Sequence, residues 1–463
     1  MKDSLCLFAA LFCLAGCRAA AQKPASGAQT WPGRMPAETR AKLRPLYDEF
    51  LQVMRRHDDD GLRRTREAIL QGMGEYAGIS EDQPDYGQPI DSSLPDLAGV
   101  EKLWAQSFAR MKGRHGWEQA ATAKTQGRPQ PRLRISFRSA RACLQSYEAG
   151  LPDKDEYLKS ARHGFDYILS AQASTGAFGY PYFPNAKDGL LSAAARLVKA
   201  GESRGLKMTE GDWVIEDLDD GGLQFDNGES GLGLLHAYAL TGKQQYLDAA
   251  RRAGEWAARR PLVSNFNYNG FSGELLARLY RVTGEQRFLD QGLEKMKYGV
   301  LPGQMINGRW PGRWFDQHNA AIQYHSIMMA QLMELYLALQ KAKHPYAAEI
   351  KQRITLGLDS LANEVNTQGV ARGKAHEMLC LDALARGLLI FGQNEKWERA
   401  ANVDVNYLCN QFLPELEKRG EPMTETVANY LLYRRVKSGK AAACEIELEK
   451  CLSAMRKPAG AAK

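Results

Sequence analysis

The chain has 463 residues, of which 44% are hydrophobic and 25% charged, and its formal net charge is +7. This hydrophobic content can build a sizeable core, which excludes a disordered chain and fits one large domain or two ordinary ones. Charges of both signs are interspersed, and no basic stripe with interleaved aromatics predicts a nucleic-acid partner.

The first residues predict export. An apolar run from Leu5 to Leu14 follows Lys2, and it is too short to span a bilayer, so residues 1–16 read as a signal peptide. The run ends in Leu-Ala-Gly-Cys, which resembles the lipobox of bacterial lipoproteins. The resemblance implies a lipid on Cys17 and anchoring in the bacterial envelope, in the periplasm or at the cell surface. The alternative is an ordinary secretory signal that is cleaved after one of the alanines at 19–21.

Residues 17–135 differ from the rest of the chain. Apolar periodicity predicts helices near 37–56, 61–76 and 97–111, which are separated by polar and Pro-containing stretches. We interpret this part as a lipid-anchored tether followed by an N-terminal helical extension.

Internal repetition dominates residues 136–440. Thr-Gly-Lys-Gln-Gln-Tyr-Leu-Asp at 241–248 recurs as Thr-Gly-Glu-Gln-Arg-Phe-Leu-Asp at 283–290, and each copy lies between two amphipathic segments. A glycine that ends one helix before the next begins predicts a helical hairpin. Looser copies near Tyr157, Tyr346 and Trp397 give five or six hairpins. The fold class is therefore all-α, an (α/α)6-type toroid of helical hairpins with an N-terminal helical extension. An open solenoid is the alternative, but its loops would be shorter and more regular.

Residues 441–463 are predicted to form a C-terminal helix and tail. Five cysteines follow Cys17, at 143, 380, 409, 444 and 451, and their scattered spacing predicts neither a disulfide framework nor a zinc site. Cys444 and Cys451 would lie about 10 Å apart along one continuous helix, which is too far for a disulfide unless the helix breaks.

The stretch from Asn307 to His325, which we call the opening stretch, combines tryptophans, arginines, an amide and two histidines just before an apolar helix. Such residues suit a carbohydrate site, because aromatic rings stack on sugars and amides bind hydroxyl groups. His318 and His325 lie seven residues apart, on the side of the helix that is predicted to face the core. A hydrogen-bonded core histidine is the alternative for His325.

These groups suit abstraction of the C5 proton of a uronate. His318 or His325 would be the base, Asn319 or Arg313 would neutralise the carboxylate, and Tyr324 would protonate the leaving oxygen. Elimination and epimerisation share this first step, so both remain open.

Further loops rich in aromatic residues and amides are expected around the same cavity, although each ring could instead fill the core. The substrate-binding candidates are Arg309, Trp310, Arg313, Trp314, Tyr180, Tyr182, Asn267, Tyr268 and His376.

An acidic segment at 216–229 offers a second chemistry. Asp226 or Glu229, with Asp219 or Asp220 as partner, could form the carboxylate pair of a glycoside hydrolase. The alternative is an acidic loop that caps the following helix. Calcium is a further alternative for this segment, although its spacing matches no EF-hand loop. No phosphate loop, Gly-x-Ser-x-Gly elbow or His-Glu-x-x-His motif is present, which argues against an NTPase, an esterase and a zincin. We expect no cofactor and assign no metal ligand.

The hairpins at about 140–435 resemble those of six-hairpin carbohydrate-active enzymes. The segment from Asn227-Gly228 to Tyr324-His325 is similar in layout to the C-terminal domain of glucuronyl C5-epimerases, and Asp226-Asn227-Gly228 resembles a motif of helical-toroid pectate lyases. Together with the lipobox, the resemblance implies an exported lipoprotein enzyme that processes a polysaccharide or oligosaccharide, with uronate-containing glycans among the candidates. A uronate lyase or related C5-acting enzyme is expected first. The alternatives are a glycoside hydrolase and a non-catalytic glycan-binding surface lipoprotein.

Overall fold

The structure is a computed structural model. It describes residues 35–76, 90–123, 125–187, 189–218, 221–314, 322–370, 376–412, 414 and 426–456. The helices predicted in the N-terminal part are present as α2 (Ala37–Arg55), α3 (Asp59–Met73) and α4 (Leu97–Met111).

Six helices stand side by side in a closed ring. Each packs against the next in chain order, and the last packs back against the first. These inner helices are α6 (Leu133–Glu148), α9 (Leu223–Thr241), α11 (Phe266–Thr283), α13 (Ile322–Lys341), α15 (His376–Phe391) and α18 (Thr426–Lys437). The closed ring confirms the predicted toroid, because an open solenoid would leave its first and last helices apart.

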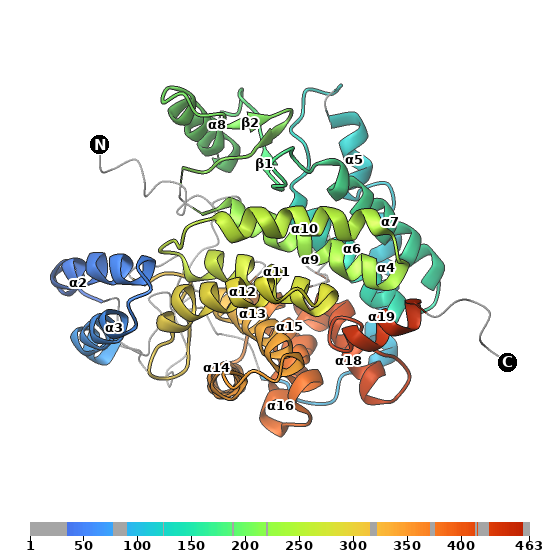
Figure 1. Cartoon of the computed structure of the whole chain (residues 1–463). Helices are drawn as coiled ribbons and strands as arrows, with labels where there is room; N and C mark the ends of the chain where they lie inside the picture. The colour runs from blue at the N-terminus through green and yellow to red at the C-terminus, as the bar shows by residue number, and fades with distance from the viewer. Residues whose placement is uncertain are drawn as a thin grey trace.

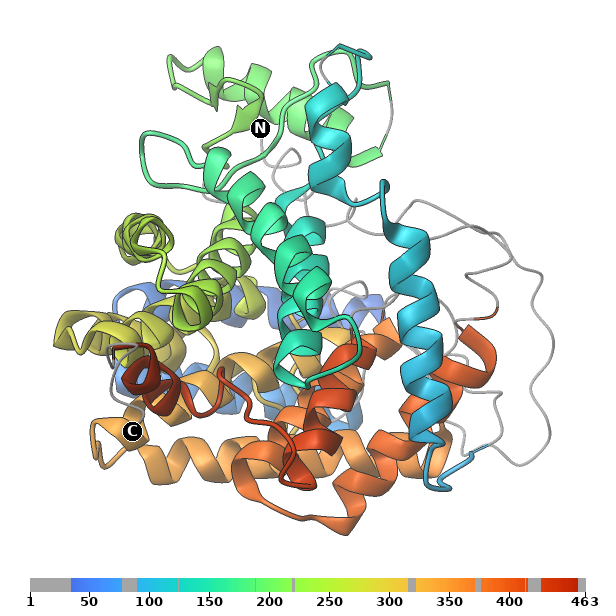
Figure 2. The ribbon, with the colours of Figure 1, turned by 90° about the vertical axis from the view of Figure 1, so that its right-hand side faces the viewer.

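A second layer of helices surrounds the ring (Figure 1). Five outer helices each follow an inner helix and pack against it: α7 (Lys154–Ser170), α10 (Gln244–Arg259), α12 (Gln286–Gly299), α14 (Ala347–Gln368) and α16 (Glu395–Tyr407). Figure 2 looks onto the first of these hairpins, α6 with α7. Since α4 packs against α18, a helix from the N-terminal part lies beside the sixth inner helix.

Burial distinguishes the two layers. Every residue of α11 from Phe266 to Val282 is buried, whereas α10 buries one stripe of residues. An inner helix is covered by neighbours on nearly every side, and an outer helix has one face in water. Gly242 and Gly284 end α9 and α11 with φ of 68° and 75°, in the left-handed region that glycine adopts without a Cβ clash.

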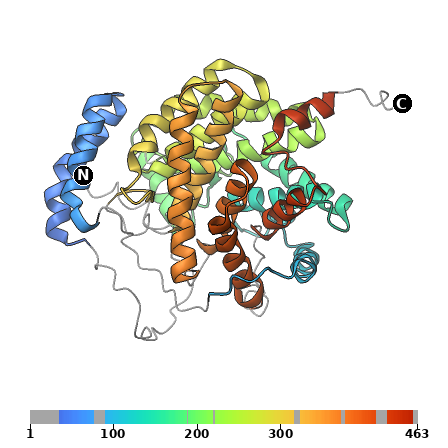
Figure 3. The same ribbon diagram turned by 90° about the horizontal axis from the view of Figure 1, so that it is seen from below.

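The hairpin of α2 and α3 lies at one edge of the molecule (Figures 1 and 3) and continues into a 3-10 turn, Gly74–Tyr76. It packs against α12 and a second 3-10 turn, η2 (Leu301–Gly303). The Phe50 and Trp314 ring centroids are 4.9 Å apart, and Arg66 Nε donates to the Pro302 carbonyl at 2.9 Å. The hairpin therefore supports the loop that leads into α13.

The chain between α7 and α9 forms a small separate layer at the top of Figure 1. It contains α8 (Gly189–Glu202) and an antiparallel sheet in the order β1-β3-β2. The strands are β1 (Tyr180–Pro181), β2 (Thr209–Glu210) and β3 (Trp213–Val214). The remaining elements are α5 (Gly116–Ala123), a π-helical turn at Leu408–Phe412 and α19 (Leu448–Arg456).

Cys444 and Cys451 do not lie on one continuous helix, so the separation expected for that case does not apply. They form a disulfide, with their Cα atoms 5.8 Å apart. Because α19 begins only at Leu448, Cys444 precedes the helix and the chain turns back between the two cysteines. Cys143, Cys380 and Cys409 are buried free thiols.

Candidate active site

The toroid has two sides. We call the side where the inner helices begin the rim, and the side where they end the base. Long segments enter α9, α13, α15 and α18 at the rim, whereas turns such as that at Gly242 connect the helices at the base. Of the stretch from Asn307 to His325, the structure describes residues 307–314, which precede α13, and the first turn of α13 at the rim.

The tryptophans of the opening stretch are not exposed platforms. Trp310 and Trp314 are 0% and 2% exposed, and their indole N–H groups donate to the carbonyls of Val300 and Gly303. Trp314 packs in a cluster of aromatic rings beneath α2. Both side chains thus hold the loop in place. These two rings fill the core, which was the alternative to stacking on a sugar.

The two arginines of the stretch differ in exposure. Arg309 is buried and forms an ion pair with Glu364 of α14. Arg313 is half-buried. Neither lines the axial cavity described below.

His325 is a core histidine in this structure. It is 1% exposed, its Nδ1 accepts from the Trp310 backbone N–H at 3.0 Å, and its Nε2 donates to the Gly357 carbonyl at 2.9 Å. Burial, assisted by the nearby Arg309 charge, lowers its pKa to about 3. With both ring nitrogens occupied, His325 connects the opening stretch to α14 and does not face the cavity. Tyr324 is buried in the main core.

Several predicted residues fall outside what the structure describes. His318, Asn319, Asp219, Asp220 and Cys17 lie outside the described residues. For His376 the helix is described, because α15 begins there, but its side chain is not.

The expected aromatic and amide loop at 265–271 is helical, because Asn265 caps α11 and the helix runs from Phe266. Asn267 and Tyr268 are consequently buried in the first turn. Tyr268 packs with Phe225 and Phe271 in a small apolar cluster at the rim. In the small layer between α7 and α9, Tyr180 is buried in β1 and Tyr182 is half-buried.

The two acidic candidates of α9 have different environments. Asp226 is 1% exposed and forms a two-bond ion pair with Arg134, with Nε to Oδ1 at 2.9 Å. Glu229 lies one turn deeper and meets Arg138 in a single contact of 3.2 Å. Among the described residues, Glu229 Oε2 has no hydrogen-bond partner. The carboxylate of Asp226 is therefore fully paired with Arg134 and has a structural role, whereas Glu229 keeps one carboxylate oxygen for a ligand.

A cavity of about 90 Å³ lies on the axis of the ring. All six inner helices contribute to it, together with one residue from the C-terminal end. Its apolar lining includes Phe137, Leu232, Phe271, Ile327 and Ala330, and its charged and amide lining is Arg138, Arg141, Gln145, Glu229, Glu274, Arg278, Asp382, Arg386 and Glu445.

Two carboxyl groups in this cavity are held toward their neutral form. Burial raises the pKa of Glu274 to about 7, and the Glu334 charge adds to this against the opposing Arg386. Burial also raises the pKa of Glu229, against the opposing Arg138 and Arg134. A carboxyl that titrates near neutral pH can donate and accept a proton at the working pH of an enzyme.

Several hydrogen-bond donors of the cavity also lack a partner among the described residues. In the described part of the chain, no partner is present for Arg278 Nε and Nη1, Arg386 Nε or Gln145 Nε2. Buried polar atoms are nearly always paired in folded proteins, so this excess in a cavity indicates groups that bind water or a ligand.

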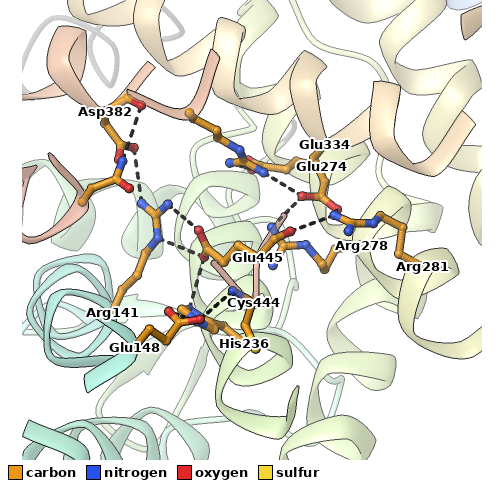
Figure 4. Close-up of polar contacts among 12 residues, drawn as sticks. Arg141, Glu148, His236, Glu274, Arg278, Arg281, Glu334, Asp382, Cys444 and Glu445 are labelled. Carbon is orange, nitrogen blue, oxygen red and sulfur yellow. Dashed lines mark hydrogen bonds and ion pairs between the residues drawn. The ribbon is translucent and has the colours of Figure 1, made fainter. Parts of the chain in front are cut away.

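Several residues that line the cavity belong to a network of buried charges (Figure 4). Glu334 accepts from Arg278 at 2.5 Å, Arg281 at 2.9 Å and Arg386 at 2.7 Å. Although burial opposes it, these arginines lower the pKa of Glu334 to about 2. Glu334 is thus a fixed anion that orients the arginines of the cavity.

Sequence reasoning missed most of the cavity. Glu274 and Arg278 are four residues apart in an otherwise apolar run, as are Asp382 and Arg386, and Arg134, Arg138 and Arg141 share one face of α6. Charged residues that recur at helical spacing on a core-facing stripe were the available signal.

Two searches of the described residues were negative. They contain no group of three or more His, Cys, Asp or Glu side chains that could hold a metal ion. No helix among them is long and apolar enough to cross a membrane.

No family model and no curated protein sequence matches this chain. Solved structures with a similar arrangement of helices include a polysaccharide lyase, with 13% identity over 75% of this chain and 99% of that one, and a TM-score of 0.47. A family 88 glycosyl hydrolase from Bacteroides vulgatus has 12% identity, covers 74% and 99% of the two chains, and has a TM-score of 0.49. A cellobiose 2-epimerase from Spirochaeta thermophila has 12% identity, covers 74% and 98%, and has a TM-score of 0.48. These proteins are named for three different reactions, and the likeness assigns none of them to this chain.

Proposed function

We propose that this chain is a carbohydrate-active enzyme that hydrolyses a glycosidic bond of an acidic saccharide in the axial cavity. The observation that carries the proposal is the pair Glu229 and Glu274, two buried carboxyl groups with raised pKa on neighbouring inner helices. Glycoside hydrolysis needs two carboxyl groups, one to protonate the leaving oxygen and one to act at the anomeric carbon or on water.

The environments of the two groups suggest their roles. Glu274, with its pKa near 7, is the proton donor to the leaving oxygen. Glu229 is the second carboxyl, because its Oε2 is unpartnered among the described residues; burial raises its pKa, and Arg138 beside it opposes that rise. Phe137 and Phe271 supply apolar surface on the cavity wall for the C–H face of a sugar ring.

The arginines favour an acidic substrate. The Arg138 side chain is 28% exposed and meets Glu229 in one contact, so the rest of its guanidinium is available to a carboxylate. Arg134 and Arg141, on the same helix, are more fully paired with protein carboxylates. Arg138 is therefore the residue that we assign to the carboxylate of the sugar.

A second candidate is C5-proton abstraction, as in a uronate lyase or epimerase. Guanidinium groups beside a carboxyl that titrates near neutral pH would neutralise the uronate while the carboxyl removes the proton. We place it second because His325 has both ring nitrogens occupied in the core.

One experiment separates the candidates. Purified protein is incubated with a panel of uronate-containing and neutral polysaccharides in deuterated water. New reducing ends without ultraviolet absorbance support hydrolysis, and absorbance from a C4=C5 double bond supports elimination. Deuterium at C5 without cleavage supports epimerisation. Binding with none of these products leaves a non-catalytic glycan-binding protein and contradicts the enzyme proposal.

Export and lipid attachment belong to the same proposal. The Leu-Ala-Gly-Cys sequence supports acylation of Cys17 in the bacterial envelope. We expect Cys17→Ser to move the protein from the membrane fraction to the soluble fraction of its host, and an unchanged distribution would exclude this anchor.

A further inference from the structure

The C-terminal segment, residues 438–456, closes the base of the toroid. It follows the last inner helix, and its helix α19 packs against the ends of α9 and α11. Arg281 of α11 donates to the carbonyls of Glu445 and Ile446 at 2.9 and 2.8 Å. The segment is thus held against the ring by its backbone, and one of its side chains lines the axial cavity.

That side chain is Glu445, and it is buried among charges from three inner helices. Its two oxygens accept from Arg141 Nε at 3.0 Å and Nη2 at 2.7 Å, and Oε1 lies 3.3 Å from His236 Nδ1 (Figure 4). Although burial opposes the charge, Arg141 and His236 hold the pKa of Glu445 well below its usual range. Glu445 is therefore a fixed carboxylate on one edge of the Arg141 guanidinium.

Arg141 lines the cavity beside this carboxylate. Its Nη1 meets Asp382 of α15 at 3.3 Å in a single contact. A guanidinium has five N–H groups in a rigid plane, so fixing the Nε and Nη2 edge determines where the others point. Without Glu445, the free edge would turn to Asp382 and form the two-bond pair that arginine and carboxylate prefer.

The disulfide lies directly beside Glu445. Cys444 is bonded to Cys451 on α19, and the Cys444 backbone N–H donates to Glu148 Oε1 at 2.6 Å. Glu148 also accepts from His236 Nε2 at 2.9 Å. Glu445 is therefore held in place by the neighbouring disulfide and by the hydrogen bonds of this segment to the inner helices.

We propose that Glu445 is a positioning residue of the cavity, seated by the Cys444–Cys451 disulfide, which holds the Arg141 guanidinium so that its N–H groups not used by Glu445 and Asp382 face an anionic sugar bound at Arg138. The choice of sugar rests on the proposed function, whereas the placement of Arg141 does not. The C-terminal segment is then part of the site as well as a cover for the base.

The test compares three variants of the full chain: Glu445→Gln, the double variant Cys444→Ser with Cys451→Ser, and Glu449→Gln as a matched control. Glu449 lies on the same segment and pairs with Arg281, but its side chain is 44% exposed and outside the cavity. Two quantities are measured by NMR: the affinity for D-glucuronate, with D-glucose as the neutral probe, and the exchange of the Arg141 Nε–H signal with water.

We expect Glu445→Gln to weaken glucuronate binding at least tenfold and to make the Arg141 signal exchange rapidly. The double serine variant should show a smaller loss of both, about threefold, and Glu449→Gln should stay within twofold of the original chain. Glucuronate binding within twofold in Glu445→Gln, or a protected Arg141 signal there, overturns the proposal.

Two other outcomes are also decisive. If the original chain binds no glucuronate, the acidic-saccharide assignment fails, and the Arg141 signal alone decides the positioning proposal. If Glu445→Gln does not fold, the double serine variant decides, and unchanged affinity and exchange in it overturn the role of the disulfide.

Discussion

Two regions of this toroid contain buried polar side chains, and they differ in how fully those side chains are paired. Around the opening stretch, His325 uses both ring nitrogens, and both indoles donate to carbonyls. Along the axis, Glu229 and Arg278 keep unpartnered atoms among the described residues. The first region has the richest sugar-binding composition, but its tryptophans and His325 are part of the core. The comparison teaches that unsatisfied groups facing a cavity locate this candidate site better than residue type does.

The largest expected effect is on the axis. Glu274→Gln removes the group that we assign as proton donor, and loss of a general acid typically reduces turnover ~10²–10⁴-fold. Because the donor must be protonated, activity of the original chain should fall as pH rises through about 7. Steady-state rates across this range, with circular dichroism to verify folding, check both points. A variant with normal rates would move the chemistry away from the axis.

The next largest effect is expected in the opening stretch, where a substitution should lower the stability of the fold. His325→Ala removes two hydrogen bonds and leaves a void in a fully buried place, so we expect ~2–4 kcal/mol lower unfolding free energy. The activity of the molecules that remain folded should be nearly unchanged. Denaturant unfolding gives the first quantity and active-site titration the second. Full stability with lost turnover would restore His325 as the catalytic base.

A smaller effect separates the arginines of one helix. Arg138→Gln should lower kcat/KM for a uronate substrate about tenfold more than for its neutral methyl ester, since one charge-assisted hydrogen bond contributes ~1.5–3 kcal/mol. Any loss that Arg138→Gln causes through Glu229 affects both substrates equally, so it cancels in the ratio of their kcat/KM values. Arg44→Gln on the surface of α2 is the control, because its side chain is 61% exposed. An equal loss on both substrates would make Arg138 a structural partner of Glu229.

The fold was more predictable than the site for a physical reason. Thr-Gly turns and apolar stripes are local signals, and the repeat of two such turns around Gly242 and Gly284 sufficed to predict stacked hairpins. Ring closure also brings α6 next to α18, across most of the chain, and this places Arg141 beside Asp382 and Glu445. No spacing in the sequence reports that meeting.

Similarly, the two regions contain histidines that look alike in sequence, each within an apolar helix. Their surroundings favour different protonation states, a neutral ring for His325 and a protonated ring for His236, because His325 has only neutral partners within hydrogen-bond distance and His236 lies between the carboxylates of Glu148 and Glu445. The sequence shows neither set of partners.

The last prediction is that neither of two histidine rings titrates near neutral pH. Although burial opposes it, Glu148 and Glu445 raise the pKa of His236 to about 9, whereas burial lowers that of His325 to about 3. Neither ring should therefore titrate between pH 5 and 8 in NMR spectra of histidine-labelled protein. His236 contributes stability that is present below pH 6.5 and is lost as pH rises through about 9. His325 acts in the opposite direction, since stability is lost as pH falls from 6.5 toward 3. A ring that titrates near 6.5 would show that its partners are not in place, and would remove the contrast between axis and core at that residue.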